Sequence, residues 1–285
     1  RVGLRLLVLP SPDCGVPGMD MNDVVGLAVA SGLGCAANRV FMVLVPSTEV
    51  VDGFPRWRWL LSASTQGFVL PVLVAWALLT PIGDGTTATD WLALSSRELP
   101  IAARWYVYAL FASQTRDMFP MPAGASITMK VHHWVVVIAC VLAILSPSGF
   151  GLFVMGSFAL ELGSLTFNLR TLYPRYPAIS ILYQVCMLLS NIAGFLVGVQ
   201  MLQISNIQLW MKLLFFVADV GVCIGRQMHA LKDAGCIRKH SHKNGAKASP
   251  VNGSASAAPE EKRNGSVRAR HQVGGGDVAR DSGGM

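Results

Sequence analysis

Residues 130–170 read KVHHWVVVIACVLAILSPSGFGLFVMGSFALELGSLTFNLR, and this stretch decides the fold. It holds two apolar runs joined by a short turn, and each run is close to the roughly 20 residues that a helix needs to cross a bilayer. The first run begins with a histidine pair and the second contains a glutamate: His132, His133 and Glu161. Ionisable groups inside an apolar span are costly, so these three residues are candidates for a functional site.

The composition agrees with a membrane protein. The chain has 285 residues, of which 52% are hydrophobic and 14% are charged, whereas a soluble domain is typically about 25% charged. The net charge of +7 lies largely in the polar C-terminal part, so we do not interpret it as a nucleic-acid signal. The sequence contains no P-loop, no GxSxG and no GxGxxG after a strand, which argues against a nucleotide-driven soluble enzyme.

We predict an all-α polytopic membrane protein, a bundle of about seven helices around a central polar pocket. The first apolar segment is the weakest, because Asn38 and Arg39 interrupt it, and a six-helix alternative omits it. The second contains Pro71, which predicts a kink. The seven segments cover 22–45, 59–80, 99–118, 127–146, 149–170, 178–203 and 208–231.

Lysine and arginine in the connecting loops predict the orientation. The connections after segments one, three, five and seven are the basic ones, whereas those after segments two, four and six carry few or no basic residues. This alternation places the N-terminus outside and the C-terminus in the cytosol. The basic residues are Arg56 and Arg58, Arg116 and Lys130, Arg170 and Arg175, and those from Lys232 onward.

The domain organisation has three parts. Residues 1–21 form an N-terminal segment whose start is uncertain, because the chain begins with Arg rather than Met. Residues 22–231 form the membrane domain. Residues 232–285 are rich in Gly, Ser, Ala, Asn, Lys and Arg and have no aromatic residue, so we expect a disordered basic cytosolic tail that cannot bury enough apolar surface to fold.

The predicted topology brings the histidine pair and the glutamate to one depth. His132 and His133 lie about 9 Å in from the cytosolic end of their helix, and Glu161 about 13 Å in from the same side. The short turn makes the two helices antiparallel neighbours. A carboxylate beside a histidine can fix its tautomer and stabilise the imidazolium, so such a histidine can act as a base or as a nucleophile toward an acyl group.

Helix geometry limits what the pair can do together. Adjacent residues on a helix point about 100° apart, so we expect one histidine to face the bundle interior and the other a neighbour or the interface. An i,i+4 pair could share a metal, but this pair should not, and we predict no metal and no bound cofactor. The alternative is that both histidines merely cap the helix entry at the interface.

Other polar groups lie inside apolar segments. Asn191 is near the middle of the sixth segment and Asp219 near the middle of the seventh, where a carboxyl group needs a partner or a cavity. Arg226 follows on broadly the same side of that helix. These residues either line a polar cavity or form a network that packs the helices together. Arg116 and Asp117 end the third segment, where we expect a solvated pair.

The sequence resembles the TLC domain family over roughly residues 50–230. The resemblance rests on the histidine pair, the glycine-bearing turn and ELGSLTFNLR, in which Glu161, Leu162, Asn168 and Arg170 match the family pattern. Gly163 and Leu165 depart from the small hydroxyl and proline positions. Gln66 is the nearest polar residue where the family often has a histidine. Further similarity is found in Trp57-Arg58-Trp59 and Tyr106-Val107-Tyr108.

With this resemblance, three functions stand as alternatives. The first is lipid homeostasis, with a lipid bound or sensed in a pocket formed by His132, His133, Glu161, Asn168, Asn191 and Asp219. The second is an acyltransferase of ceramide-synthase type with His132, His133 and Glu161 as catalytic residues and acyl-CoA as substrate. The third is a structural or translocon-associated membrane protein. The implied partners are membrane lipids, with a homo- or hetero-oligomer left open, and the implied location is the endoplasmic reticulum rather than the plasma membrane.

Overall fold

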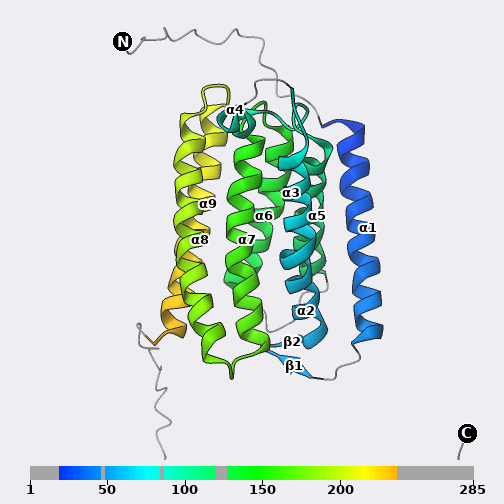
Figure 1. Ribbon diagram of the computed structural model, residues 1–285, viewed down its shortest axis with the longest axis vertical. Helices are drawn as coiled ribbons and strands as arrows, with labels where there is room; N and C mark the ends of the chain where they lie inside the picture. The colour runs from blue at the N-terminus through cyan, green and yellow to red at the C-terminus, as the bar shows by residue number, and fades with distance from the viewer. Residues whose placement is uncertain (1–18, 46–48, 84–86, 120–126, 236–285) are drawn as a thin grey trace, which may run out of the picture. The chain divides into compact units, whose positions relative to one another are not determined.

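The computed structural model describes residues 19–45, 49–83, 87–119 and 127–235. The predicted N-terminal segment 1–21 and the predicted tail 232–285 lie almost entirely outside these ranges. The described part is mostly helical (Figure 1). Its helices are α1 Met21–Leu44, α2 Arg56–Ser64, the π-helix η1 Thr65–Val69, α3 Leu70–Leu79, α4 Ala88–Ala93, α5 Ile101–Met118, α6 Ile127–Leu145, α7 Phe150–Leu172, α8 Pro177–Gln203 and α9 Leu209–Asp233.

Each of the seven predicted segments falls on a helix, and four helical stretches are long and apolar enough to cross a membrane. These four are α1, the continuous stretch α2–η1–α3, α7 and α8, and α6 contributes a shorter apolar stretch, Met129–Leu145. The chain therefore has the helices of an integral membrane protein. In contrast, α5 and α9 carry more charged residues, namely Arg104, Arg116 and Asp117 in α5 and Lys212, Asp219, Arg226, Lys232 and Asp233 in α9.

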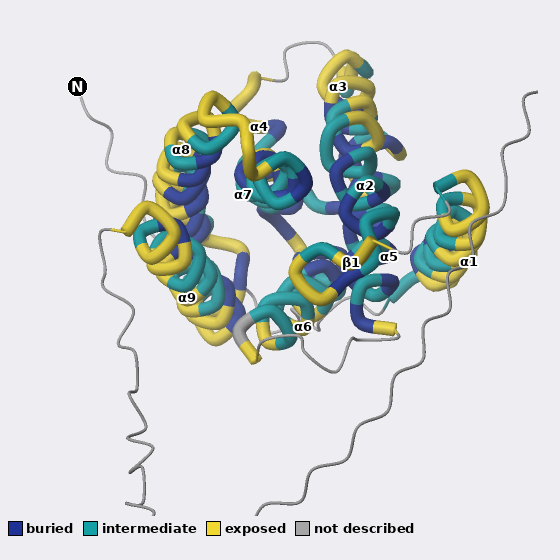
Figure 2. The backbone as a smooth tube through the Cα atoms, turned by 90° about the horizontal axis from the view of Figure 1, so that it is seen from below, coloured by how far each residue is buried: buried dark blue, intermediate teal, exposed yellow. Residues whose placement is uncertain are grey.

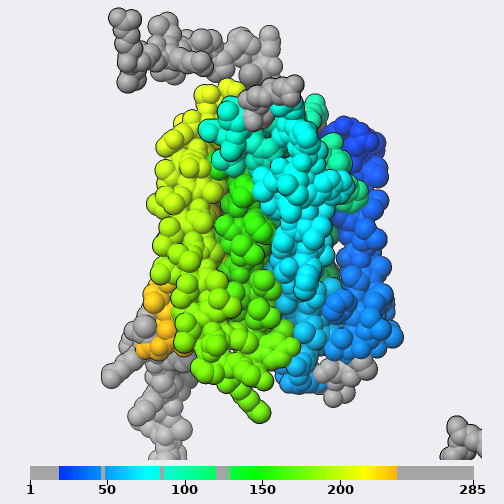
Figure 3. Space-filling view, in the orientation of Figure 1, coloured from blue at the N-terminus to red at the C-terminus, as the bar shows by residue number. Residues whose placement is uncertain are grey.

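Helix α7 lies in the middle of the bundle. Figure 2 shows α8 and α9 on one side of it and α2, α3 and α5 on the other, with α6 completing the ring. On the face drawn in Figure 3, α7 is visible between α8 and the α2–α3 stretch. Small residues allow this close packing: a Cβ added at Gly156 would come within 2.6 Å of Val197 in α8. The central position of α7 carries Glu161 into the interior.

Helix α1 stands at the edge of the bundle, beyond α5 (Figures 1 and 2). Its contact with α5 centres on Tyr108, whose hydroxyl donates to the buried carboxylate of Asp23. Gly26 makes room for this ring, since an added Cβ would lie 2.3 Å from Tyr108 Cε2. Asn38 and Arg39 do not interrupt the helix, which is continuous over Met21–Leu44.

The second segment contains a wide turn in place of a simple kink. Five residues, Thr65–Val69, form a π-helical turn between α2 and α3, and the Leu70 N–H donates to the Thr65 carbonyl. Pro71 follows immediately and has no N–H to donate, and its ring would clash with the preceding turn of a regular helix. The wider turn accommodates it. Such turns are frequent at functional sites, and this one carries Gln66.

The turn between α6 and α7 is fastened to α4. Gly149 has a left-handed backbone, with φ 78°, a conformation that glycine adopts without strain. Its N–H and the Ser148 hydroxyl both donate to the Ala93 carbonyl, at 2.8 and 2.6 Å. α4 itself begins with a capping box, and the hydrogen bond from Thr87 holds the pKa of Asp90 below its usual range. These contacts fix the start of α7.

A small hairpin is the one feature that an all-α prediction omits within the described ranges. Strands β1 Val50–Val51 and β2 Phe54–Pro55 pair antiparallel just before α2. The indole N–H of Trp59 donates to the Val51 carbonyl at 2.8 Å. The hairpin thereby fastens the chain to the start of α2 and places Phe54 in the lining of the cavity described next.

Candidate functional site: two cavities meeting at His132 and Glu161

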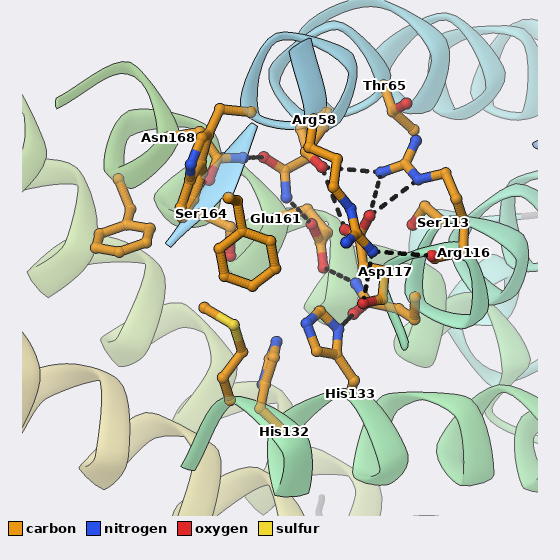
Figure 4. A pocket seen from close by; sticks show the side chains of 17 residues that line it. Arg58, Thr65, Ser113, Arg116, Asp117, His132, His133, Glu161, Ser164 and Asn168 are labelled. Carbon is orange, nitrogen blue, oxygen red and sulfur yellow. Dashed lines mark hydrogen bonds and ion pairs between the residues drawn. The ribbon is translucent and has the colours of Figure 1, made fainter. Parts of the chain in front are cut away.

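A polar cavity of about 130 Å³ lies among α2, η1, α5, α6 and α7. In Figure 4, His132 and His133 extend from α6 toward Glu161, with Arg116 and Asp117 to one side. A buried water needs roughly 10–15 Å³, so the cavity has room for several waters or a small polar group. The lining residues are Phe54, Arg58, Trp59, Ser62, Thr65, Gln66, Ser113, Gln114, Arg116, Asp117, Met129, His132, His133, Glu161, Ser164, Phe167 and Asn168.

Glu161 is the centre of a chain of amide hydrogen bonds. Gln66 Nε2 donates to one carboxylate oxygen at 2.6 Å, and Gln114 Nε2 donates to the other at 3.3 Å. Asn168 Nδ2 in turn donates to Gln66 Oε1 at 2.7 Å. Both oxygens of this buried carboxylate thus accept an N–H, the arrangement that an ionised carboxylate requires, since it can only accept. Glu161 therefore orients both glutamine amides.

The chain of amides continues to His133. The Gln114 carbonyl oxygen faces His133 Nδ1, and because an amide oxygen accepts, the proton is assigned to Nδ1. The lone pair then lies on Nε2, the atom that a general base uses. His133 and Glu161 are thus coupled through the Gln114 amide. The intervening amide performs the orienting role that was assigned to the carboxylate.

The two histidines share one cavity. Their ring centroids are 5.6 Å apart and both residues line the polar cavity. His133 faces the neighbouring helix α5, where it contacts Gln114, and the cavity extends from there to α7. Neither histidine simply caps the helix entry.

Arg116 and Asp117 are not a solvated pair. The Arg116 side chain is only 4% exposed; its guanidinium lies 2.9 Å from Asp117 Oδ1 and donates to Ser62 at 2.8 Å. Arg58, also buried, donates to the backbone carbonyls of both residues. Burial is tolerable because each charged group has hydrogen-bond partners. This cluster makes one wall of the cavity strongly polar.

Arg226 of α9 forms a helix-packing network beside the cavity. Its guanidinium donates to Ser164 Oγ and the Leu160 carbonyl of α7, both at 2.8 Å, and to Asn191 Oδ1 of α8 at 3.1 Å. The Asn191 amide N–H in turn donates to Gln227 Oε1 at 3.0 Å. The network joins three helices, and Asn191 lies in it, outside the lining of both cavities.

A second, largely apolar cavity of about 100 Å³ lies among α6, α7, α8 and α9. His132 and Glu161 line this cavity as well as the polar one, so the two cavities meet at these residues. Asp219 lies in its wall. The remaining lining residues are Val135, Val136, Ala139, Phe153, Gly156, Ser157, Leu160, Val197, Gly198, Met201, Phe215, Ala218 and Val222.

The structure therefore distributes the six predicted pocket residues over three places. His133 and Asn168 belong to the polar cavity, and His132 and Glu161 belong to both cavities. Asp219 belongs to the apolar cavity alone, and Asn191 to the Arg226 network.

Sequence reasoning missed Gln114. A glutamine is uncharged, and Gln114 lies two residues before the charged pair Arg116 and Asp117, which is the more prominent polar feature of this segment. The available signal was helical spacing: Gln114 follows Leu110 and precedes Met118 on one face, and all three are buried. A lone amide on a buried apolar face needs a polar partner.

In the described ranges, no group of three or more His, Cys, Asp or Glu side chains is arranged to hold a metal ion. Comparisons with protein-family models, with curated proteins and with solved structures find no match for the chain. The chain thus has the helices of an integral membrane protein, and the two cavities lie among those helices.

Proposed function

We propose that this chain is a multi-pass membrane protein of TLC domain type that acts in membrane lipid homeostasis by binding or sensing a lipid. One observation carries the proposal: a polar and an apolar cavity meet at His132 and Glu161. An amphipathic molecule needs both environments, with its polar head among hydrogen-bonding groups and its chain among apolar side chains. His132, His133, Glu161 and Asn168 would hold the head.

The proposed topology has seven spans, with the C-terminus in the cytosol and the protein in the endoplasmic reticulum. The charges of α5 and α9 are compatible with spanning, because the cavity wall accounts for Arg116 and Asp117 and the packing network for Arg226. Intramembrane charges that face the bundle interior and are paired are those that membrane proteins retain. A glycan added at Asn252 in cells would contradict this orientation.

Lipid binding is tested on the full-length protein purified in mild detergent. Native mass spectrometry should detect co-purifying lipid on the wild type, and Glu161→Leu should lose it, because the head site loses its central acceptor. Ser205→Ala, an exposed loop residue, is the control and should retain the lipid. Untargeted lipidomics of cells with and without the chain then identifies the lipid class. If no lipid co-purifies and the profiles are unchanged, the structural alternative takes its place.

A second candidate, acyl transfer from acyl-CoA, is favoured by the orientation of His133. With the proton on Nδ1, Nε2 would accept the proton of an amine or hydroxyl as that group attacks the thioester carbonyl, and would return it to the departing thiolate. Incubation with radiolabelled acyl-CoA and a long-chain amine separates the two functions. Transfer that His133→Ala abolishes would make the protein an enzyme, whereas lipid binding without transfer favours a binding role.

A further inference from the structure

Asp219 is the unexplained polar group of the apolar cavity. Its Oδ2 atom is buried and has no hydrogen-bond partner among the described residues. Within the described ranges, the contact given for Oδ1 is with a thiol, Cys223 Sγ at 3.8 Å. A buried oxygen without a donor costs about 1–3 kcal/mol, so a carboxyl group in this position calls for a partner that the described part of the chain does not supply.

The Asp219 carboxyl lies close to the backbone of α8 at Gly198. A Cβ added at Gly198 would lie 2.6 Å from Asp219 Oδ2, so only a glycine leaves room for the carboxyl there. The cavity surface contains one further hydroxyl, that of Ser157, which donates to the Phe153 carbonyl and pairs with Tyr106. The other walls around Asp219 are apolar. A water needs two to four polar partners, and this part of the cavity offers it one.

Helix geometry gives the distance between Asp219 and the head site. Arg226 donates to the Leu160 carbonyl, which places Arg226 level with Glu161. Asp219 comes seven residues earlier on the same helix, which is about 10 Å along the axis. The apolar cavity thus has polar contacts at two depths, His132 and Glu161 at one end and Asp219 about two turns further in.

We propose that the apolar cavity selects a lipid whose chain carries a hydroxyl group part of the way along it, and that this hydroxyl donates to the Asp219 carboxyl group. The inference rests on the proposed lipid-binding function and adds a chemical class of ligand to it. A hydroxyl fits better than an ammonium, because a carboxyl oxygen accepts from it in either protonation state and a neutral group costs less to bring into an apolar cavity.

The test uses the full-length protein in nanodiscs and neutral probes. Radiolabelled octadecanol is displaced by unlabelled octadecanol or by a series of octadecanediols whose second hydroxyl moves along the chain. We expect the wild type to prefer one mid-chain diol by about tenfold, the effect of one hydrogen bond to a buried carboxyl group. A diol with its second hydroxyl at the chain terminus should lose this preference.

Two variants connect the preference to Asp219. Asp219→Leu should bind octadecanol and all the diols alike, whereas Asp219→Asn, which retains an acceptor oxygen, should keep most of the preference. Val222→Ala alters the same cavity wall without removing a polar group, so both affinities should change and their ratio should not.

The outcomes separate this inference from the proposed function. Binding of octadecanol and all diols with equal affinity by the wild type would overturn the hydroxyl selection while leaving lipid binding intact. A preference that survives in Asp219→Leu would do the same, because the hydroxyl would then be recognised elsewhere. If no probe binds, both the selection and the lipid-binding function fail.

Discussion

Helices α1 and α7 have nearly the same hydropathy and opposite roles. Their most apolar 18-residue windows are equally suited to a bilayer, yet 6% of the α1 window is buried inside the protein against 50% of the α7 window. α1 lies at the edge and contacts α5 around one buried pair, Asp23 and Tyr108. α7 is enclosed and provides Glu161 and Ser164 to two hydrogen-bond networks.

The difference shows that mean hydropathy does not indicate whether a helix lies at the edge of a bundle or in its centre. An apolar run is needed whether a helix faces lipid or other helices, so its mean value does not distinguish the two. The distinction lies in the polar and small residues within the run. Each of the following substitutions tests whether α7 is held by internal contacts and α1 by few of them.

The largest effect is expected for Gly163→Val in α7. A Cβ at this position would lie 2.2 Å from Ser190 Oγ and 2.4 Å from Arg226 Nη2, so the guanidinium must leave its partners. We expect a loss of about 3–6 kcal/mol, because hydrogen bonds to a charged group contribute about 1.5–3 kcal/mol each. Thermal unfolding of the purified protein in detergent measures it. A midpoint equal to that of the wild type would mean that the Arg226 network does not hold α7.

Glu161→Leu should have a smaller effect on stability, about 1–3 kcal/mol. Two amide N–H groups lose their acceptor, at about 1–3 kcal/mol each, and relief from burying a charge offsets part of this loss. Glu161→Gln is the matched control, since its amide oxygen still accepts one N–H. If the two variants unfold at the same temperature, the convergence of amides on Glu161 has no energetic role.

Tyr108→Phe tests the attachment of α1. The change leaves the Asp23 carboxylate buried without its donor, and we expect a loss of about 1–2 kcal/mol. Tyr183→Phe is the control, because the Tyr183 hydroxyl is buried without a hydrogen-bond partner in the described part of the chain. Its removal should leave the unfolding midpoint unchanged or raise it. The opposite order of the two midpoints would contradict the proposed attachment.

The smallest effect is expected for Gly32→Ala in α1. Nothing lies within 4 Å of an added Cβ, and alanine in a helix interior is favoured over glycine by about 0.5–1 kcal/mol. We expect a slightly raised unfolding midpoint. A marked loss of stability would show that this face of α1 is packed against something, and α1 would then resemble α7.

Much of the helical framework follows from the sequence, because apolar runs of sufficient length specify helices almost independently of their neighbours. The meeting of His132, His133 and Glu161 was also accessible, since a short turn forces their two helices together. Side-chain partners were not accessible. Gln114 mediates the histidine–glutamate coupling, and whether an amide lies between the imidazole and the carboxylate depends on how α5 packs against α6 and α7. The burial of Arg116 has the same origin.

The hydrogen bonds around Glu161 have a direction. Every amide between His133 and Asn168 turns its N–H toward this one carboxylate. If Glu161 carried a proton and donated it to the Gln114 side, that amide would have to turn over and present its N–H to His133. His133 would then have to accept at Nδ1 and hold its own proton at Nε2. The protonation state of Glu161 would thus determine which nitrogen of His133, two side chains away, carries the proton.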